Sequence, residues 1–210
     1  MTHTLHRQGS RESLERDYVV LAIPAKGINS AGSGENLQKA KEIMARHSPV
    51  NMGDLKIGNK YAHGRERVLT PPTEDGTVVH AVYRDLDTLA RVLDDLRRAG
   101  TGLSVVVSGL FDHVAECCRQ TGLEVHTTEF SLGVHGKIML LPEPQVLEVT
   151  TMCGHGMVGA ELVRQMVGNV RRGSMTPRRA SEELARQCVC GIMNPGRAAE
   201  LIVKMACSAP

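Results

Sequence analysis

The residues of this chain best suited to chemistry are cysteines in two short segments of its last third. Residues 151–156 (TMCGHG) contain Cys153 and His155, and residues 188–191 (CVCG) contain Cys188 and Cys190. Thiolates and imidazole are the ligands that zinc and iron–sulfur clusters prefer in proteins. In a chain without a disulfide-rich composition, such a group indicates a metal site before a disulfide framework.

This pattern predicts a metal centre with Cys153, Cys188 and Cys190 as ligands. A [4Fe–4S] cluster is the preferred expectation, because three cysteines leave one iron open for substrate. Zinc is the alternative, since His155 can complete a tetrahedral set of four ligands. The spacing does not separate the two metals, and a third interpretation has three unlinked cysteines in a helical core.

Cys153 also suits a nucleophile, because it is predicted to end a strand over residues 146–150 and to precede a helix over residues 157–172. A thiol at a helix N-terminus loses its proton more easily than a free thiol. Without a metal, Cys153 would attack the substrate and Cys188 or Cys190 would resolve the product. The other three cysteines receive no role: Cys117, Cys118 and Cys207.

Two strand ends carry residues suited to binding an anion. The glycine-rich segment 25–34 follows a predicted strand and contains Lys26 and Asn29, and Ser108 ends another strand. Backbone amides in such loops bind phosphates and carboxylates. Neither GxxxxGK[ST] nor GxGxxG occurs in segment 25–34, so a flexible connection is the alternative.

His135 and Lys137 lie in a short segment between glycines, residues 131–137 (SLGVHGK). The pair is predicted to supply a general acid and a clamp for a carboxylate, whereas a simple turn would need the glycines alone. His155 is a further acid or base if it binds no metal. Residues 48–76 contain two short segments with polar side chains, residues 51–54 and 59–64. These segments are expected to form a lid or to have no function.

Hydrophobic periodicity predicts the elements that position these residues. Strands are expected at 17–23, 77–83, 103–108, 123–128 and 146–150. Helices are expected at 35–47, 85–99, 111–120 and 157–172, and after the Thr176-Pro177 and Asn194-Pro195 start signals. Residues 48–76 are expected to form a long loop, and residues 1–16 to be loose.

The alternation of strands and helices favours parallel strands with right-handed crossovers. The predicted fold class is therefore α/β, a Rossmann-like three-layer domain with a mostly parallel sheet over residues 1–150. A helical, cysteine-containing C-terminal segment, residues 151–210, is expected to pack on it.

Composition excludes several classes of function. The chain has 210 residues, a formal net charge of +2, no Trp, two Phe and three Tyr. Few aromatics and no basic patch argue against nucleic-acid and membrane-surface binding. The absence of a signal peptide and of a span of ~18 apolar residues predicts a cytoplasmic protein with reduced thiols. A homodimer is expected, as for many small proteins of this class.

These features predict an enzyme that acts on a small anionic metabolite at a [4Fe–4S] centre, by lyase or sulfur-transfer chemistry. The open iron would act as a Lewis acid, and His155 or His135 would move a proton. Two alternatives remain open. One is a metal-free enzyme whose cysteine nucleophile transfers persulfide or thiol groups, and the other is a non-catalytic zinc-binding subunit.

Overall fold

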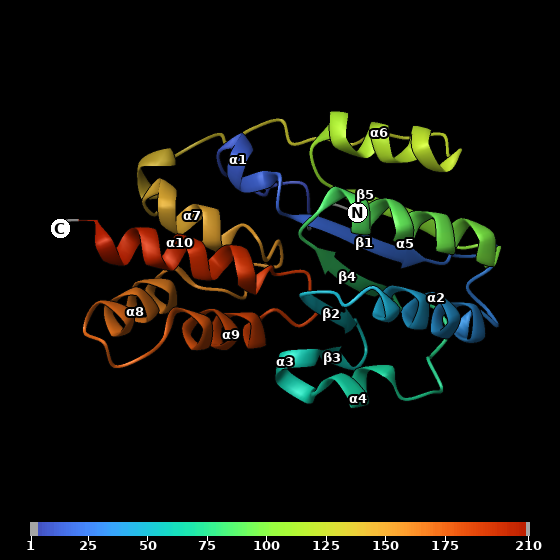
Figure 1. Ribbon diagram of the computed structural model, residues 1–210, viewed down its shortest axis with the longest axis horizontal. Coiled ribbons are helices and arrows are strands. Elements are labelled where there is room, and N and C mark those ends of the chain that lie inside the picture. Colours follow the sequence, from blue (N-terminus) through green and yellow to red (C-terminus); the bar gives the residue numbers. More distant parts are fainter. Residues whose placement is uncertain (1–3, 209–210) are drawn as a thin grey trace.

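A computed structural model describes residues 4–208 of the chain. Its centre is a five-stranded sheet in the order β3-β2-β4-β1-β5 (Figure 1). Every pair of neighbouring strands is antiparallel, so the predicted parallel, Rossmann-like sheet is wrong. The strands are β1 (Tyr18–Ile23), β2 (Asn51–Asp54), β3 (Gly58–Asn59), β4 (Val79–Tyr83) and β5 (Ser104–Ser108).

The connections explain why strands separated by helices are not neighbours. Helix α2 (Gly34–Arg46) joins β1 to β2, and β4 lies between these two strands. Helix α5 (Leu86–Ala99) joins β4 to β5, and β1 lies between them. The two strands of each strand–helix–strand segment are therefore separated in the sheet by one strand of the other segment. This arrangement is the split β-α-β pattern. Alternation of strands and helices along a sequence is common to this arrangement and to a parallel sheet.

Residues 48–76, predicted to form a loop, contain four elements: β2, β3, α3 (Lys60–His63) and α4 (Arg65–Leu69). All four residues of β2 are buried, although Asn51 and Asp54 are polar. Hydrophobicity therefore gave no signal for this strand. Buried hydrogen bonds of both side chains replace the apolar contacts that a strand pattern requires.

The two faces of the sheet pack against different helices. Tyr18, Val20 and Ala22 of β1 belong to the core formed with α2 and α5, to which α6 (Phe111–Thr121) contributes Cys117. Val19 and Leu21 belong to the opposite core, formed with the C-terminal helices. Alternate side chains of one strand thus point to opposite faces.

The C-terminal helices are α7 (Pro144–Thr150), α8 (Ala160–Arg171), α9 (Pro177–Gln187) and α10 (Pro195–Cys207), which lie together in Figure 1. The two start signals are confirmed: the side chains of Thr176 and Asn194 accept hydrogen bonds from the first turns of α9 and α10. The predicted strand at 146–150 is wrong, because these residues continue the helix that Pro144 begins.

Residues 123–128 form no strand either. The chain from α6 to α7 is irregular apart from η2 (Ile138–Leu140). Within residues 4–208, no helix is long and apolar enough to cross a bilayer.

The N-terminal segment is tied to the C-terminal helices. Residues 4–16, predicted to be loose, include the short helix α1 (Arg11–Leu14), whereas residues 1–3 lie outside the described part. The guanidinium groups of Arg7 and Arg197 contact Asp17 Oδ2 at 2.5 and 2.8 Å. All three side chains are almost completely buried. The sheet and the C-terminal helices are thus joined by ionic contacts as well as by an apolar core.

Candidate thiol site

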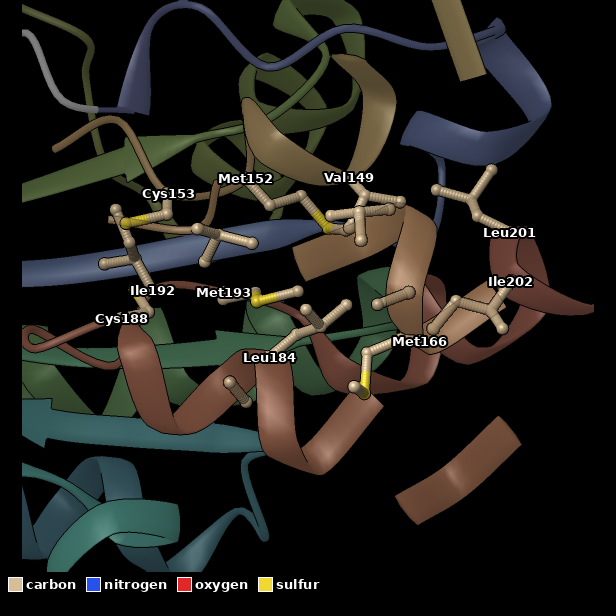
Figure 2. Packing of buried hydrophobic residues seen from close by; sticks show 14 of the residues in the cluster. Val149, Met152, Cys153, Met166, Leu184, Cys188, Ile192, Met193, Leu201 and Ile202 are labelled. Carbon is tan, nitrogen blue, oxygen red and sulfur yellow. The ribbon is translucent and has the colours of Figure 1, made fainter. Parts of the chain in front are cut away.

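The structure brings Cys153, Cys188, Cys190 and His155 together. The Sγ atoms of Cys188 and Cys190 are 4.0 Å apart, and Cys190 Sγ lies 3.6 Å from His155 Nδ1. Cys153 is hydrogen-bonded to Cys188. The three cysteines are buried in the core below the C-terminal helices, whereas His155 is exposed. Figure 2 shows Cys153 and Cys188 at one end of this core, away from Met166 and Leu201.

Cys153 lies in a turn that follows α7. Its amide donates to the carbonyl of Thr150 at 3.1 Å, and the amide of Gly156 donates to the Cys153 carbonyl at 3.0 Å. Gly156 has a φ of +69°, which favours glycine. The turn directs the amides of His155 and Met157 toward Cys153 Sγ. Helix α8 begins only at Ala160, so Cys153 does not sit at a helix N-terminus as predicted.

Cys188 and Cys190 lie in the turn between α9 and α10. The amide of Gly191 donates to the Cys188 carbonyl at 2.9 Å. A Cβ atom at Gly191, which has a φ of +75°, would lie 2.6 Å from the carbonyl carbon of Met52. No real Cβ atom approaches a backbone so closely, so only glycine lets this turn lie directly on strand β2.

We call residues 188–193 the cysteine turn. Three side chains from other parts of the chain donate hydrogen bonds to its backbone carbonyl groups. The Asn59 amide donates to the Cys188 carbonyl at 2.8 Å, and the Asn51 amide donates to the Met193 carbonyl at 2.9 Å. Arg7 donates to the carbonyl of Ile192. The backbone amides of Ile192 and Met193, in the same turn, lower the pKa values of Cys190 and Cys188 respectively.

The three thiols have different acidities. The hydrogen bond with Cys188, together with burial, raises the pKa of Cys153 far above its usual value. For Cys188, the hydrogen bond from Cys153 lowers the pKa, but the bond to Cys190 and burial outweigh it and raise the pKa to about 12. The hydrogen bond from Cys188 and the amide of Ile192 lower the pKa of Cys190 despite its burial. Of the three thiols, Cys190 is therefore the one whose pKa is lowered, while the pKa values of Cys153 and Cys188 are raised.

Within residues 4–208, no three side chains of Cys, His, Asp or Glu form a group arranged to hold a metal ion. The cysteines and His155 instead make a series of contacts in which each residue touches the next. The [4Fe–4S] cluster and zinc therefore stay predictions from the sequence.

The residues predicted to bind an anion at segment 25–34 make other contacts. Lys26 is exposed, and the side chain of Asn29 bonds to the Ala25 amide and the Gly102 carbonyl at 2.6 and 2.7 Å. The Asp75 carboxylate accepts hydrogen bonds from the amides of Gly32 and Gly34, both at 2.7 Å. A carboxylate of the chain itself thus fills the N-terminus of α2. This loop lies at the opposite end of the sheet from the cysteine turn (Figure 1).

The remaining predicted residues also contact other parts of the chain. Ser108 donates to the Thr4 carbonyl at 3.1 Å, and His135 Nε2 lies 3.0 Å from the Leu132 carbonyl. Lys137 is exposed in the irregular segment before α7. Of the three residues predicted to be catalytic, the structure brings only His155 to the cysteines.

Asn51, Asn59 and Arg7 were not recognised from the sequence as parts of this site. The polar groups at 51–54 and 59–64 were visible, but no local pattern pairs them with carbonyl groups far along the chain. The available signal was the position of Asn59 directly before a short helix, where asparagine is a preferred cap.

The site thus contains three buried thiols, of which Cys190 alone has a lowered pKa. Comparisons with protein-family models, with curated proteins and with solved structures gave no match.

Proposed function

We propose that the chain is a thiol enzyme that exchanges sulfur–sulfur bonds with a small substrate, with Cys190 as the nucleophile and Cys188 as the resolving thiol. The 4.0 Å separation of the two sulfurs, within a turn whose amides face them, is the observation that carries this proposal. Thiolates, and not thiols, attack disulfides and persulfides. The acidity of Cys190 and the neighbouring imidazole of His155 both favour this residue over Cys153.

The reaction has two steps. The Cys190 thiolate attacks one sulfur of a substrate R–S–S–R′, forms the mixed disulfide Cys190–S–S–R and releases R′–S⁻. The Cys188 thiol then loses its proton to the medium and attacks the Cys190 sulfur. A Cys188–Cys190 disulfide forms and R–S⁻ leaves. The substrate gains two electrons, and the two cysteines lose them.

Access to Cys190 requires movement of the turn that contains His155. Residues 154–157 are exposed, whereas the three thiols are buried, and the left-handed φ of Gly156 lets the chain reverse there. The backbone hydrogen bond within the turn joins Gly156 to Cys153. Movement of this segment would break that hydrogen bond but none within a helix, because α7 ends at Thr150 and α8 begins at Ala160.

Alkylation of the full chain tests the assignment. The protein is purified without oxygen and treated with iodoacetamide from about pH 5 to pH 10, a range that covers ordinary thiol titration. Mass spectrometry then gives the rate at each cysteine. We expect Cys190 to react with an apparent pKa below that of Cys117, a buried cysteine on the other face of the sheet. Oxidised glutathione should give a Cys188–Cys190 disulfide, and Cys188→Ala should retain glutathione on Cys190.

Two results would overturn the proposal. One is glutathionylation that Cys190→Ser leaves unchanged, because the nucleophile would then be another residue. The other is stoichiometric iron or zinc in the purified protein that is lost in Cys190→Ser and that blocks alkylation. That outcome would support the metal centre predicted from the sequence.

A further inference from the structure

Strand β5 is an edge strand without the usual protection. Within the described residues it pairs with β1 alone, and it makes no backbone–backbone hydrogen bond to another segment. Only its last residue is held from the N-terminal segment, since the Ser108 hydroxyl donates to the Thr4 carbonyl at 3.1 Å. Its sequence, Ser-Val-Val-Val-Ser, contains no charge and no proline. Natural proteins shorten, charge or cover such edges, because a free apolar edge recruits another strand. The opposite edge follows this rule, since β3 is only two residues long.

The irregular segment that follows α6 carries apolar side chains into solvent. Every residue from 124 to 141 is exposed except Ser131, which is half-buried. Figure 1 shows this segment on the β5 side of the sheet, passing from α6 to α7. Eight of its large apolar side chains are between 42% and 86% exposed: Val125, Phe130, Leu132, Val134, Ile138, Met139, Leu140 and Leu141.

We infer that β5 and the apolar segment 124–141 form an interface with a second copy of this chain. The two β5 strands pair antiparallel across a twofold axis at Val106. This register places Ser104 opposite Ser108 of the partner subunit and Val105 opposite the partner's Val107. A twofold interface requires such self-complementarity, and no like charges face one another in it.

The apolar area is of the size that a stable dimer needs. Burial of one large apolar side chain removes on the order of 100 Å² from water. The exposed fractions of the eight side chains then correspond to roughly 500 Å² per subunit. The two subunits together would bury roughly 1,000 Å², which is the total that a specific interface should reach.

Sedimentation equilibrium of the full chain tests the inference. We expect a monomer–dimer equilibrium, and a lysine at Val105, which is 38% exposed, to weaken dimerisation at least tenfold. Leu132→Glu should act in the same direction. Val203→Lys is the matched control, because Val203 is 41% exposed on helix α10, away from β5.

Hydrogen exchange locates the interface independently of any variant. At high protein concentration the amides of β5 should exchange more slowly than at low concentration, while those of α10 should not change. A protein that remains monomeric up to its solubility limit would refute the inference. A dimer with no concentration-dependent protection of β5, or one that Val203→Lys weakens as much as Val105→Lys does, would refute it too.

Discussion

The side-chain amide of Asn59 lies 2.8 Å from the carbonyl oxygen of Cys188, although 129 residues separate the two in sequence. The same side chain accepts hydrogen bonds from the amides of Tyr61 and Ala62 at 2.8 and 3.1 Å. One buried asparagine therefore caps helix α3 and also fixes the end of α9 where the cysteine turn begins.

Asn59→Ala should loosen the cysteine turn. We expect a loss of about 1–3 kcal/mol in the free energy of unfolding, because a helix cap and buried carbonyl partners are removed together. The alkylation pKa of Cys190 should rise, since its amide donor is less well held. Urea unfolding and alkylation rates measure the two effects. Asn29→Ala is the control: it removes side-chain bonds at the other end of the sheet and should leave Cys190 unchanged.

Cys188→Ala should make Cys190 less acidic. The thiol of Cys188 is the first cause of the lowered pKa of Cys190, so its removal should move the alkylation profile of Cys190 to higher pH. Cys117→Ala provides the comparison and should leave this profile in place. An unchanged profile in Cys188→Ala would mean that the backbone amides alone set the acidity.

Asp17→Asn should destabilise the protein strongly. The carboxylate of Asp17 lies between the guanidinium groups of Arg7 and Arg197, and removing one partner of a buried ion pair costs about 3–5 kcal/mol. Chemical denaturation measures the loss. Glu200→Gln is the matched exposed case, where contacts with Arg16 and Arg84 should contribute no more than about 1 kcal/mol. Equal effects of the two substitutions would contradict this assignment.

Cys117 should make stability depend on pH in the alkaline range. Burial raises its pKa from 9.0 to about 11, so its contribution to stability is complete below pH 9.0 and is lost as pH rises toward about 11. Relative to Cys117→Ala, the wild type should lose up to about 3 kcal/mol over that interval. Thermal unfolding at several pH values measures this. A constant difference between the two proteins would show that the thiol ionises as easily in the folded state as in the unfolded state.

Sequence patterns located most helices and three of the strands, because periodic apolar residues and helix start signals act locally. Thr176-Pro177 and Asn194-Pro195 began helices as predicted. Strand direction depends on which elements become neighbours, and β1 pairs with β4 and β5 through contacts that no local pattern encodes. Strand β2 was not predicted, because its buried polar residues form hydrogen bonds with residues elsewhere in the chain and give no hydrophobic pattern.

The cysteine grouping was visible from residue type alone, whereas the acidity of each thiol was not. Cys153 was predicted to be activated by a helix N-terminus, but the chain makes a further turn before α8. Which sulfur carries the negative charge depends on amide directions and on side chains such as Asn51. These amide directions and side-chain contacts depend on how the cysteine turn packs against β2, so they can be read from the structure but not from the sequence.

The contact between Asp17 and Arg197 also constrains when the chain can fold. The carboxylate belongs to the start of the first strand, and its guanidinium partner is 180 residues further along. During synthesis the sheet can collapse early and Arg7 can already pair with Asp17, but the second guanidinium contact of this carboxylate forms only after α10 has been made.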